Sequence, residues 1–501
     1  QWKRLAALSS AAVMAAGTLL YFPIDTLQNI SWGITASAEE TGTVTWTQTE
    51  SDNLTWTLDA EGTMAISGTG AMKNYGTNNS PAAQKKASVK KVVIEDGITS
   101  IGDYAFFDCS SLTSIEIPEG VTSIGEFVFF SCYKLTEVFL ENGSKLTSGN
   151  LGVDESIIGT YWNEGDLTWT LTADGTMTIS GKGAMKEDYN TYYSPAYDNE
   201  NIKKVVIEDG VTSIGAYAFS GCNNLASIEI PSSVTSIGIG AFQNCSSLTD
   251  ITILGSVTSI EDYAFFGCSS LTSITIPESV TSIGESAFYN CTGLTSIEIP
   301  EGVTSIGGSA FERCSSLTSI KIPKSVTSIE NSAFYNCTGL TSIEIPDSVT
   351  SIGDNAFYGT LWLTNKRQEN DSLVIVNGIL IDGTTCSGDA SITIPESVTS
   401  IGNYAFYNCT GLTSITIPKS VTSIRDFAFF GCTGLTSVTI PKSVTSVGDK
   451  AFSGCGKLTE VLLENGSTLT SGQLGVDASK IRTYWNEDNL TWTLTADGTL
   501  T

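Results

Sequence analysis

Short stretches of alternating hydrophobic and polar residues recur along most of the chain. In the stretch LTSIEIP, Ile297 and Ile299 are separated by Glu298 and preceded by Ser296. A period of two with β-branched residues at the apolar positions predicts a half-buried strand. Pro300 ends this strand, because proline cannot donate the next hydrogen bond of a ladder.

Two further segments complete the unit. VTSIG predicts a second short extended piece in which Val303 and Ile306 face inward. ESAFYNC, which ends at Cys291, predicts a tight helical or 3₁₀ turn that packs Ala287 and Phe288 inside. The unit therefore comprises two extended pieces and one turn.

This unit repeats every 23 residues. Most steps between copies are 23 residues long, but the step from 349 to 398 exceeds that period by 26, and a different module fills the gap from 121 to 211. A period between about 20 and 50 residues predicts a solenoid, in which each unit buries its apolar face by stacking on its neighbours. The motif [IV]TS[IV] begins at Ile98, Val121, Val211, Val234, Val257, Val280, Val303, Val326, Val349, Val398, Val421 and Val444.

A longer repeat lies outside these arrays. DNLTWTLDAEGTMAISGTGAMKNY has a close copy at 165–189 and a copy cut short at 488–501. Leucine and tryptophan alternate with threonine before an Ala-Asp-Gly turn, which predicts a β-hairpin. We expect Trp56, Trp169 and Trp492 to form its core face or to plug an open end of the solenoid. An aromatic sugar-binding platform is the alternative.

An insertion, LWLTNKRQENDSLVIVNGILIDG, occupies 361–383. Its second half predicts a hairpin with Asn377-Gly378 at the turn, and the charged NKRQEND (365–371) predicts an exposed approach to that hairpin. Two interpretations stay open. The insertion is either a partner contact on an otherwise regular rod or a replacement for the missing turn of one coil.

All twelve cysteines occupy one position of the repeat. In-register coils place equivalent Cβ atoms about 4.8 Å apart with parallel vectors, whereas a disulfide needs about 3.8 Å and converging vectors. We therefore predict buried thiols that fill a tight corner and bond a backbone carbonyl of the next coil, with Thr360 in that role where a cysteine is missing. Zinc ligation and thiol catalysis are also rejected, because no C-x-x-C motif or neighbouring base is present. In the long array this ladder comprises Cys222, Cys245, Cys268, Cys291, Cys314, Cys337, Cys386, Cys409, Cys432 and Cys455.

The N-terminus has the pattern of an export signal. Lys3 and Arg4 precede the apolar stretch LAALSSAAVMAAGTLL, and ASA (36–38) fits cleavage before Glu39. A membrane anchor is the alternative, but the stretch is short for a span, and no other apolar run approaches about 18 residues. We expect the mature chain to be secreted or at the cell surface, without membrane insertion.

Composition narrows the function further. The 501 residues include 53 Asp and Glu against 25 Lys and Arg, and phosphate backbones repel a chain with this net charge of −28. No histidine is present, which excludes Ser–His–Asp and Cys–His catalysis and His-ligated zinc or haem. The sequence thus predicts no nucleic-acid partner, no cofactor and no enzymatic activity.

The outward residues of the first strand form the candidate binding face. Glycosidase chemistry needs two carboxyls about 5–9.5 Å apart in a cleft, whereas Glu298 and Glu344 lie about 10 Å apart on an open face with Lys321 between them. We predict binding of an extracellular protein or glycan through many weak polar contacts. A structural spacer, or the non-catalytic region of a larger secreted enzyme that continues beyond Thr501, is the alternative. The face comprises Ser227, Glu229, Thr252, Ser273, Thr275, Ser296, Glu298, Ser319, Lys321, Ser342, Glu344, Ser414 and Thr416.

The repeat unit resembles the bacterial BspA-like leucine-rich repeat, also described with treponemal surface repeats. LTSIxIP, VTSIG, Ala-Phe and the cysteine carry the resemblance, over about 88–140 and 202–463. It implies a leucine-rich-repeat fold and a secreted or surface-exposed bacterial protein. It also implies adhesion to host matrix proteins or to other bacteria.

We therefore predict a mainly β fold, a leucine-rich-repeat solenoid of parallel strands with short helical turns, in which two arrays are interleaved with small β-hairpin modules. The expected order is a signal peptide (1–38), a β-hairpin module (39–87), a short leucine-rich repeat array (88–145), a linker with the second hairpin module (146–201), a long array (202–465) with the insertion (361–383), and a linker with a truncated third hairpin module (466–501).

Overall fold

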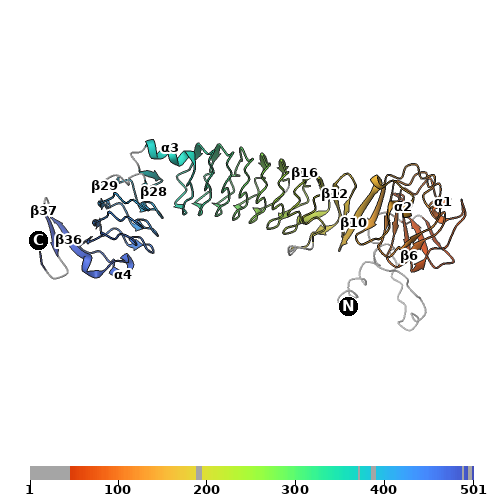
Figure 1. Cartoon of the computed structure of the whole chain (residues 1–501), viewed down its shortest axis with the longest axis horizontal. Coiled ribbons are helices and arrows are strands. Elements are labelled where there is room, and N and C mark those ends of the chain that lie inside the picture. The colour runs from red at the N-terminus through yellow and green to blue at the C-terminus, as the bar shows by residue number, and fades with distance from the viewer. Residues whose placement is uncertain are drawn as a thin grey trace, which may run out of the picture.

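Stacked coils form an elongated rod, with α1 (Pro81–Gln84) near one end and β37 (Leu490–Leu494) at the other (Figure 1). The predicted signal peptide, Cys386 and the last two residues of the predicted approach lie outside the described residues. No helix in the described part is long and apolar enough to cross a membrane. The computed structural model describes residues 44, 46–187, 194–254, 256–369, 373–384, 391–487, 490–494 and 499–500.

The coils stack as parallel strands in two series, one for each extended piece of the repeat. Strand series 1 comprises β5 (Lys91–Ile94), β7 (Ser114–Ile117), β9 (Glu137–Glu141), β14 (Lys204–Ile207), β16 (Ser227–Glu229), β18 (Asp250–Thr252), β20 (Ser273–Thr275), β23 (Ser319–Lys321), β25 (Ser342–Glu344), β29 (Ser391–Thr393), β31 (Ser414–Thr416), β33 (Ser437–Ile440) and β35 (Glu460–Glu464). Strand series 2 comprises β6 (Ile98–Ile101), β8 (Ser123–Ile124), β15 (Val211–Ile214), β17 (Ser236–Ile237), β19 (Ser259–Ile260), β21 (Ser282–Ile283), β22 (Ser305–Ile306), β24 (Ser328–Ile329), β26 (Ser351–Ile352), β30 (Ser400–Ile401), β32 (Ser423–Ile424) and β34 (Ser446–Val447).

The other elements lie before, between and after the arrays. The remaining strands are β1 (Trp46–Thr49), β2 (Thr55–Leu58), β3 (Thr63–Ser67), β4 (Gly70–Ala71), β10 (Ile158–Glu164), β11 (Leu167–Leu171), β12 (Thr176–Gly181), β13 (Gly183–Ala184), β27 (Val374–Val376), β28 (Ile379–Asp382) and β36 (Ile481–Glu487). The remaining helices are α2 (Ser148–Leu151), α3 (Leu361–Glu369) and α4 (Ser471–Leu474), with 3₁₀ turns at Glu155–Ile157 and Ala478–Lys480.

The strands of the first two hairpin modules belong to the same hydrogen-bonded sheet as the neighbouring strands of series 1. One sheet runs in the order β1-β2-β3-β5-β7-β9-β10-β11-β12-β14-β16, so the antiparallel strands β10, β11 and β12 connect the short array to the long array. The core cluster of the long array begins at Leu167, in the hairpin itself. Trp169 is fully buried, and its ring lies 5.7 Å from that of Phe219. The hairpin therefore covers the end of the long array's core.

Neighbouring strands of series 1 pair in register, so equivalent residues lie side by side. β18 and β20 pair Ile251 with Ile274 and Thr252 with Thr275. The isoleucines are buried and the threonines are exposed, which is the alternation predicted from the sequence. One register thus fixes the inward and outward residues of every coil.

A threonine ladder holds each coil to the one before it. Thr272 Oγ1 donates to the Thr249 carbonyl at 3.0 Å in series 1, and Thr281 Oγ1 donates to the Thr258 carbonyl at 3.2 Å in series 2. Similar bonds recur at separations of 23 residues along both series. These threonines are therefore structural, whereas the serines that follow them in β20 and β25 of series 1 are exposed.

The turn that precedes Cys291 is not helical, contrary to the prediction. The amides of Ser286, Phe288 and Asn290 each donate to a carbonyl of the next coil at 2.8 Å. Ser286 and Asn290 take left-handed backbone angles, with φ of 53° and 58°, which a right-handed helix does not contain. Bonds to the next coil therefore alternate with local i→i+3 bonds, in which the amides of Tyr289 and Cys291 donate to the carbonyls of Ser286 and Phe288. Ala287 and Phe288 are fully buried as predicted.

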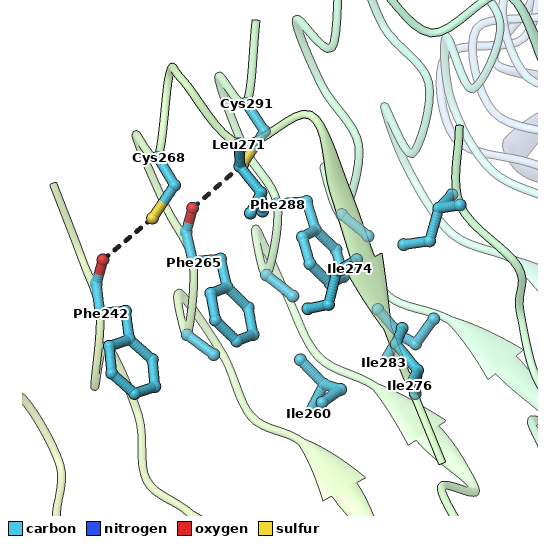
Figure 2. Packing of buried hydrophobic residues seen from close by; sticks show 14 of the residues in the cluster. Phe242, Ile260, Phe265, Cys268, Leu271, Ile274, Ile276, Ile283, Phe288 and Cys291 are labelled. Atoms are coloured by element: carbon cyan, nitrogen blue, oxygen red, sulfur yellow. Dashed lines mark hydrogen bonds between the residues drawn. The ribbon is translucent and has the colours of Figure 1, made fainter. Parts of the chain in front are cut away.

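A ladder of phenylalanine rings runs through the core (Figure 2). Phe242, Phe265 and Phe288 stack with 5.4 Å between successive ring centroids and interplanar angles of 9° and 5°. The same stacking continues to Phe357 and resumes at Phe406 beyond the insertion. Each ring contacts an identical ring in the next coil, so one coil's core depends on its neighbours.

Eleven described cysteines form a second ladder, and each is free and buried. Cys268 Sγ donates to the Phe242 carbonyl and Cys291 Sγ donates to the Phe265 carbonyl, both at 3.1 Å (Figure 2). The acceptor lies in the preceding coil, not in the next coil as predicted. The Phe265 carbonyl already accepts the Cys268 amide that closes its own turn, and it has a second lone pair for the following coil.

Thr360 does not take the role predicted for it. Its buried hydroxyl donates to the Phe357 carbonyl of its own coil at 2.7 Å and accepts the Leu363 amide at 3.0 Å. The second bond caps the start of α3, a helix where an exposed approach was predicted. Trp362 is buried, with its ring 4.8 Å from that of Phe357, so α3 covers the core at this point.

The insertion divides the long array at a boundary that we call the seam. One sheet of series 2 ends at β26, and the next begins with the hairpin β27–β28, whose turn is the predicted Asn377-Gly378. The cores on the two sides form separate clusters. Side chains bridge the seam, because the Asn377 amide donates to the Pro346 carbonyl at 2.7 Å and the Asn403 amide donates to Asp354.

We expect Cys291→Ala to lower the free energy of unfolding by about 1–2 kcal/mol, because it leaves a small cavity and removes the thiol donor of the Phe265 carbonyl. Urea denaturation followed by circular dichroism measures this loss. Glu298→Ala, an exposed site nearby, is the matched control and should shift stability by less than about 0.5 kcal/mol. Equal midpoints for both variants, or thiols that react at once in the native protein, would contradict the buried ladder.

Candidate interaction surface and seam cavity

The predicted binding face lies along strand series 1 as one open surface. Twelve of its thirteen residues are exposed, and Ser414 is half-buried. Parallel pairing aligns them in rows, with Ser319 opposite Ser342 and Lys321 opposite Glu344. The structure therefore brings these residues together as lines along the rod rather than around a cleft.

One coil of this face departs from the strand pattern. Ser296 and Glu298 are exposed and Ile297 is buried, yet no strand pairing joins this segment to β20 or β23 in the part that the structure describes. The same seven letters, LTSIEIP, contain the strand β25 two coils further on. The side-chain alternation therefore persists without the ladder.

Charges on the face are only loosely paired. Lys204 Nζ lies 2.6 Å from Glu229 Oε1, with both side chains largely in the solvent. Exposed ion pairs of this kind contribute at most about 1 kcal/mol, so they exchange readily for a partner's charges. Glu298 and Glu344 stand on the same open face, and the described residues contain no group of three or more acidic or cysteine side chains placed to hold a metal ion.

The thiol ladder is chemically protected. Burial raises the pKa of the Cys222 and Cys268 thiols to about 12. Burial likewise raises the pKa of Cys291 well above its ordinary value, and the neighbouring Cys314 adds to the effect. Because the thiolate is the reactive form, these groups stay protonated hydrogen-bond donors at neutral pH.

The hairpin tryptophans differ from one another. Trp56 and Trp169 are fully buried and belong to core clusters, as expected for a core face or an end plug. Trp492, on β37, is 41% exposed. The aromatic sugar-platform interpretation is therefore wrong for the first two tryptophans, because no ring face is available to a sugar.

Sequence reasoning missed a set of aromatic residues on the turn side of the rod. Most of them lie two and five residues before the cysteine position, beside the buried phenylalanine, and Tyr133 lies one residue after Cys132. Phe127, Phe130 and Tyr133 are exposed by 51%, 56% and 87%. Alignment of the repeats could have found the first two, because aromatic residues recur at both positions, as in Tyr404 and Tyr407.

A cavity of about 400 Å³ opens on this turn side at the seam. Tyr335 and Tyr358 line it from the coils before the insertion, and Tyr404 and Tyr407 line it from the coil after. Arg367 of α3 also lines it. The cavity could not be read from the sequence, because it depends on how the two stacks meet.

The sequence matches the family described as BspA type Leucine rich repeat region, in six copies, over residues 80–150, 190–316, 258–377 and 385–480. No curated protein matches the chain.

Three solved structures similar to this chain are each 26% identical to it. For a leucine-rich repeat protein from Eubacterium ventriosum the TM-score is 0.35, and the match covers 60% of this chain and 83% of that one. For a leucine-rich repeat protein from Bacteroides ovatus the TM-score is 0.34, and the match covers 64% of this chain and 90% of that one. For a leucine rich cell surface protein from Faecalibacterium prausnitzii the TM-score is 0.31, and the match covers 86% of this chain and 97% of that one.

The thiol pKa shifts predict a loss of stability at alkaline pH. Above about pH 9 the unfolded chain releases thiol protons that the folded chain keeps, so the free energy of unfolding falls as pH rises, by up to about 1.4 kcal/mol per pH unit for each thiol. The fall should continue to about pH 12, where Cys222 and Cys268 titrate in the fold. Urea denaturation midpoints at about pH 8, 9, 10 and 11 measure this fall in the free energy of unfolding.

Tyrosine and lysine side chains titrate in the same range, so a single-thiol variant provides the control. Above about pH 9 the free energy of unfolding of Cys268→Ala should fall less steeply with pH than that of the unmodified chain. The difference should equal the contribution of about one thiol. Parallel declines in the two proteins would show that the thiols do not contribute.

Proposed function

The chain belongs to the BspA type leucine-rich repeat family, and we propose that it is an extracellular protein that binds a macromolecular partner, a protein or a glycan, through strand series 1. The resemblance predicted from the sequence is thereby confirmed, as is the predicted leucine-rich-repeat solenoid. The proposal includes no catalytic step.

The observation that carries the proposal is the exposed, in-register arrangement of short polar side chains on series 1. Equivalent residues of successive coils stand about 4.8 Å apart, on a backbone that hydrogen bonds and packed rings hold rigid. A preorganised surface loses little conformational entropy on binding, so many weak contacts can add up. Serine and threonine offer both donors and acceptors to such a partner.

Charge indicates which partner surfaces fit. The chain carries a net charge of −28, and Glu229, Glu298 and Glu344 project from the face. A basic partner surface would be attracted and an acidic one repelled, with an association rate that falls as salt rises.

The extracellular location rests on the N-terminal pattern of an export signal. Free thiols are compatible with it, because oxidation requires an accessible thiolate and the described thiols are buried. The described thiols are therefore protected from oxidation by their burial.

We expect the protein to bind at least one of immobilised fibronectin, immobilised fibrinogen and a glycan array in a saturable manner. The double variant Glu298→Lys with Glu344→Lys should weaken that binding about tenfold or more, because it reverses two charges on the face. Surface plasmon resonance at two salt concentrations measures the affinity and its salt dependence.

A matched control places the same charge change on another side of the rod. Glu285→Lys with Glu330→Lys alters two exposed glutamates that lie outside series 1. This control should bind as the unmodified chain does. Equal weakening by both pairs would remove the face from the proposal, and absence of saturable binding to all three probes would favour a structural spacer.

A further inference from the structure

The seam interrupts a ladder of aromatic rings on the turn side of the rod. Before the seam, Tyr335 and Tyr358 stack with 5.4 Å between ring centroids; after it, Tyr407 and Phe430 stack with 5.7 Å. By the register of the repeat, the position between Tyr358 and Tyr407 is Thr384, two residues before Cys386. Thr384 therefore leaves a gap between these two stacks, as Glu312 does between Tyr289 and Tyr335, but only the gap at Thr384 borders the seam cavity among the described residues.

The gap at Thr384 leaves a slot within the seam cavity. Tyr358 and Tyr407 both line the cavity and are 49% and 42% exposed. Each has a ladder neighbour stacked on the face turned away from the seam. Because both tyrosines border the same cavity, a flat six-membered ring bound there can contact them at about 5 Å, an ordinary stacking separation.

A preorganised polar group lies beside the slot. Arg367 Nε donates to Asp382 Oδ1 at 3.0 Å, and its Nη2 donates to Asp382 Oδ2 at 2.6 Å. Thr384 Oγ1 accepts from Arg367 Nη2 at 3.2 Å and donates to Asp382 Oδ1 at 3.1 Å. All three residues line the cavity, and Asp382 is buried. This network holds donors and acceptors in place without a net charge, because the guanidinium and the carboxylate neutralise each other.

The chemistry of the slot selects among ligands. An apolar aromatic side chain would fill the gap between the tyrosines but would leave Arg367, Asp382 and Thr384 facing a group that cannot bond them, at a cost in desolvation. An anionic ligand would meet a guanidinium already neutralised by Asp382, on a protein of net charge −28. A neutral pyranose ring suits both the tyrosine rings and the polar network. Its C–H faces can contact the two tyrosines, while its hydroxyls both donate and accept hydrogen bonds.

We propose that the seam cavity binds one pyranose ring of a neutral glycan, held between Tyr358 and Tyr407, with its hydroxyls bonded by the Arg367–Asp382–Thr384 network. A volume of about 400 Å³ is at the lower end of ligand pockets, about 300–1,000 Å³, and so fits one or two rings rather than a long chain. The site is distinct from strand series 1, and it gives the insertion a function beyond replacing a turn.

Saturation-transfer difference NMR on the full chain tests the proposal. The probes are the methyl pyranosides of glucose, galactose, mannose and N-acetylglucosamine, with the β1,4-linked or α1,4-linked trisaccharides of glucose. We expect at least one probe to bind, with saturation strongest on the ring C–H protons. Tyr358→Ala and Tyr407→Ala should each weaken binding about tenfold or more, at the scale of one lost stacking contact.

Matched variants separate the site from general damage to the rod. Tyr289→Ala removes a stacked tyrosine at the same repeat position but outside the cavity, and should leave sugar binding unchanged. Thr384→Val keeps the side-chain shape, removes the hydroxyl and should weaken binding several-fold. Intact thiol protection in each variant shows that the coils remain stacked.

Three outcomes would overturn the proposal. They are absence of binding by every neutral probe, equal effects of Tyr289→Ala and Tyr358→Ala, and preferential binding of N-acetyltyrosinamide or sialyllactose, which would assign the slot to an aromatic side chain or an anion. Binding through strand series 1 is unaffected by these variants, so failure here leaves the proposed function intact.

Discussion

Hydrogen bonding between successive coils is the interaction on which the rest of the structure depends. Each coil presents backbone groups to the coil before it and to the coil after it. The rod is stable only if these groups are in register from one coil to the next. The threonine hydroxyls, the cysteine thiols and the left-handed turn residues all meet this requirement, because each donates to a neighbouring coil or exposes an amide that does. A period of 23 residues persists because a change in the length of one coil would misalign all three kinds of bond at once.

Stacking of this kind leaves an apolar core open wherever it stops. The chain closes these places with tryptophan. Trp169 covers the first coil of the long array, and Trp362 on α3 covers the last coil before the seam. The two candidate surfaces have opposite origins. The polar face of series 1 results from repetition of the same inward and outward alternation, whereas the cavity lies where the insertion interrupts the long array and Thr384 occupies the position that Tyr358 and Tyr407 hold in the flanking coils.

Features that depend on periodicity could be predicted from the sequence, and features that depend on competition between bonds could not. The alternation of Ile297 and Ile299 with polar residues fixed the inward set, and the spacing of the cysteines excluded disulfides. The turn before Cys291 was predicted as helical because its local sequence permits a helix, but amides that bond the next coil prevent it. The helix α3 was missed for the opposite reason. Lys366 and Arg367 suggested an exposed connection, and only the cap at Thr360 and the burial of Trp362 show that a helix forms.

One sequence that occurs twice separates the features that depend on the local sequence from those that depend on the tertiary structure. SAFYNCTGLTSIEIP stands at 286–300 and at 332–346, and both copies have the same left-handed turn residues, buried phenylalanine and thiol bond to the preceding coil, of which the sequence pattern predicted the buried phenylalanine. These features are set within a coil and its immediate neighbour, which the repeat itself supplies. The second copy forms β25, paired with β23, and the first forms no strand that the structure describes. Identical residues cannot account for that difference. A β-ladder needs a partner strand at the correct height, and only the tertiary arrangement of the neighbouring coils decides whether one is there.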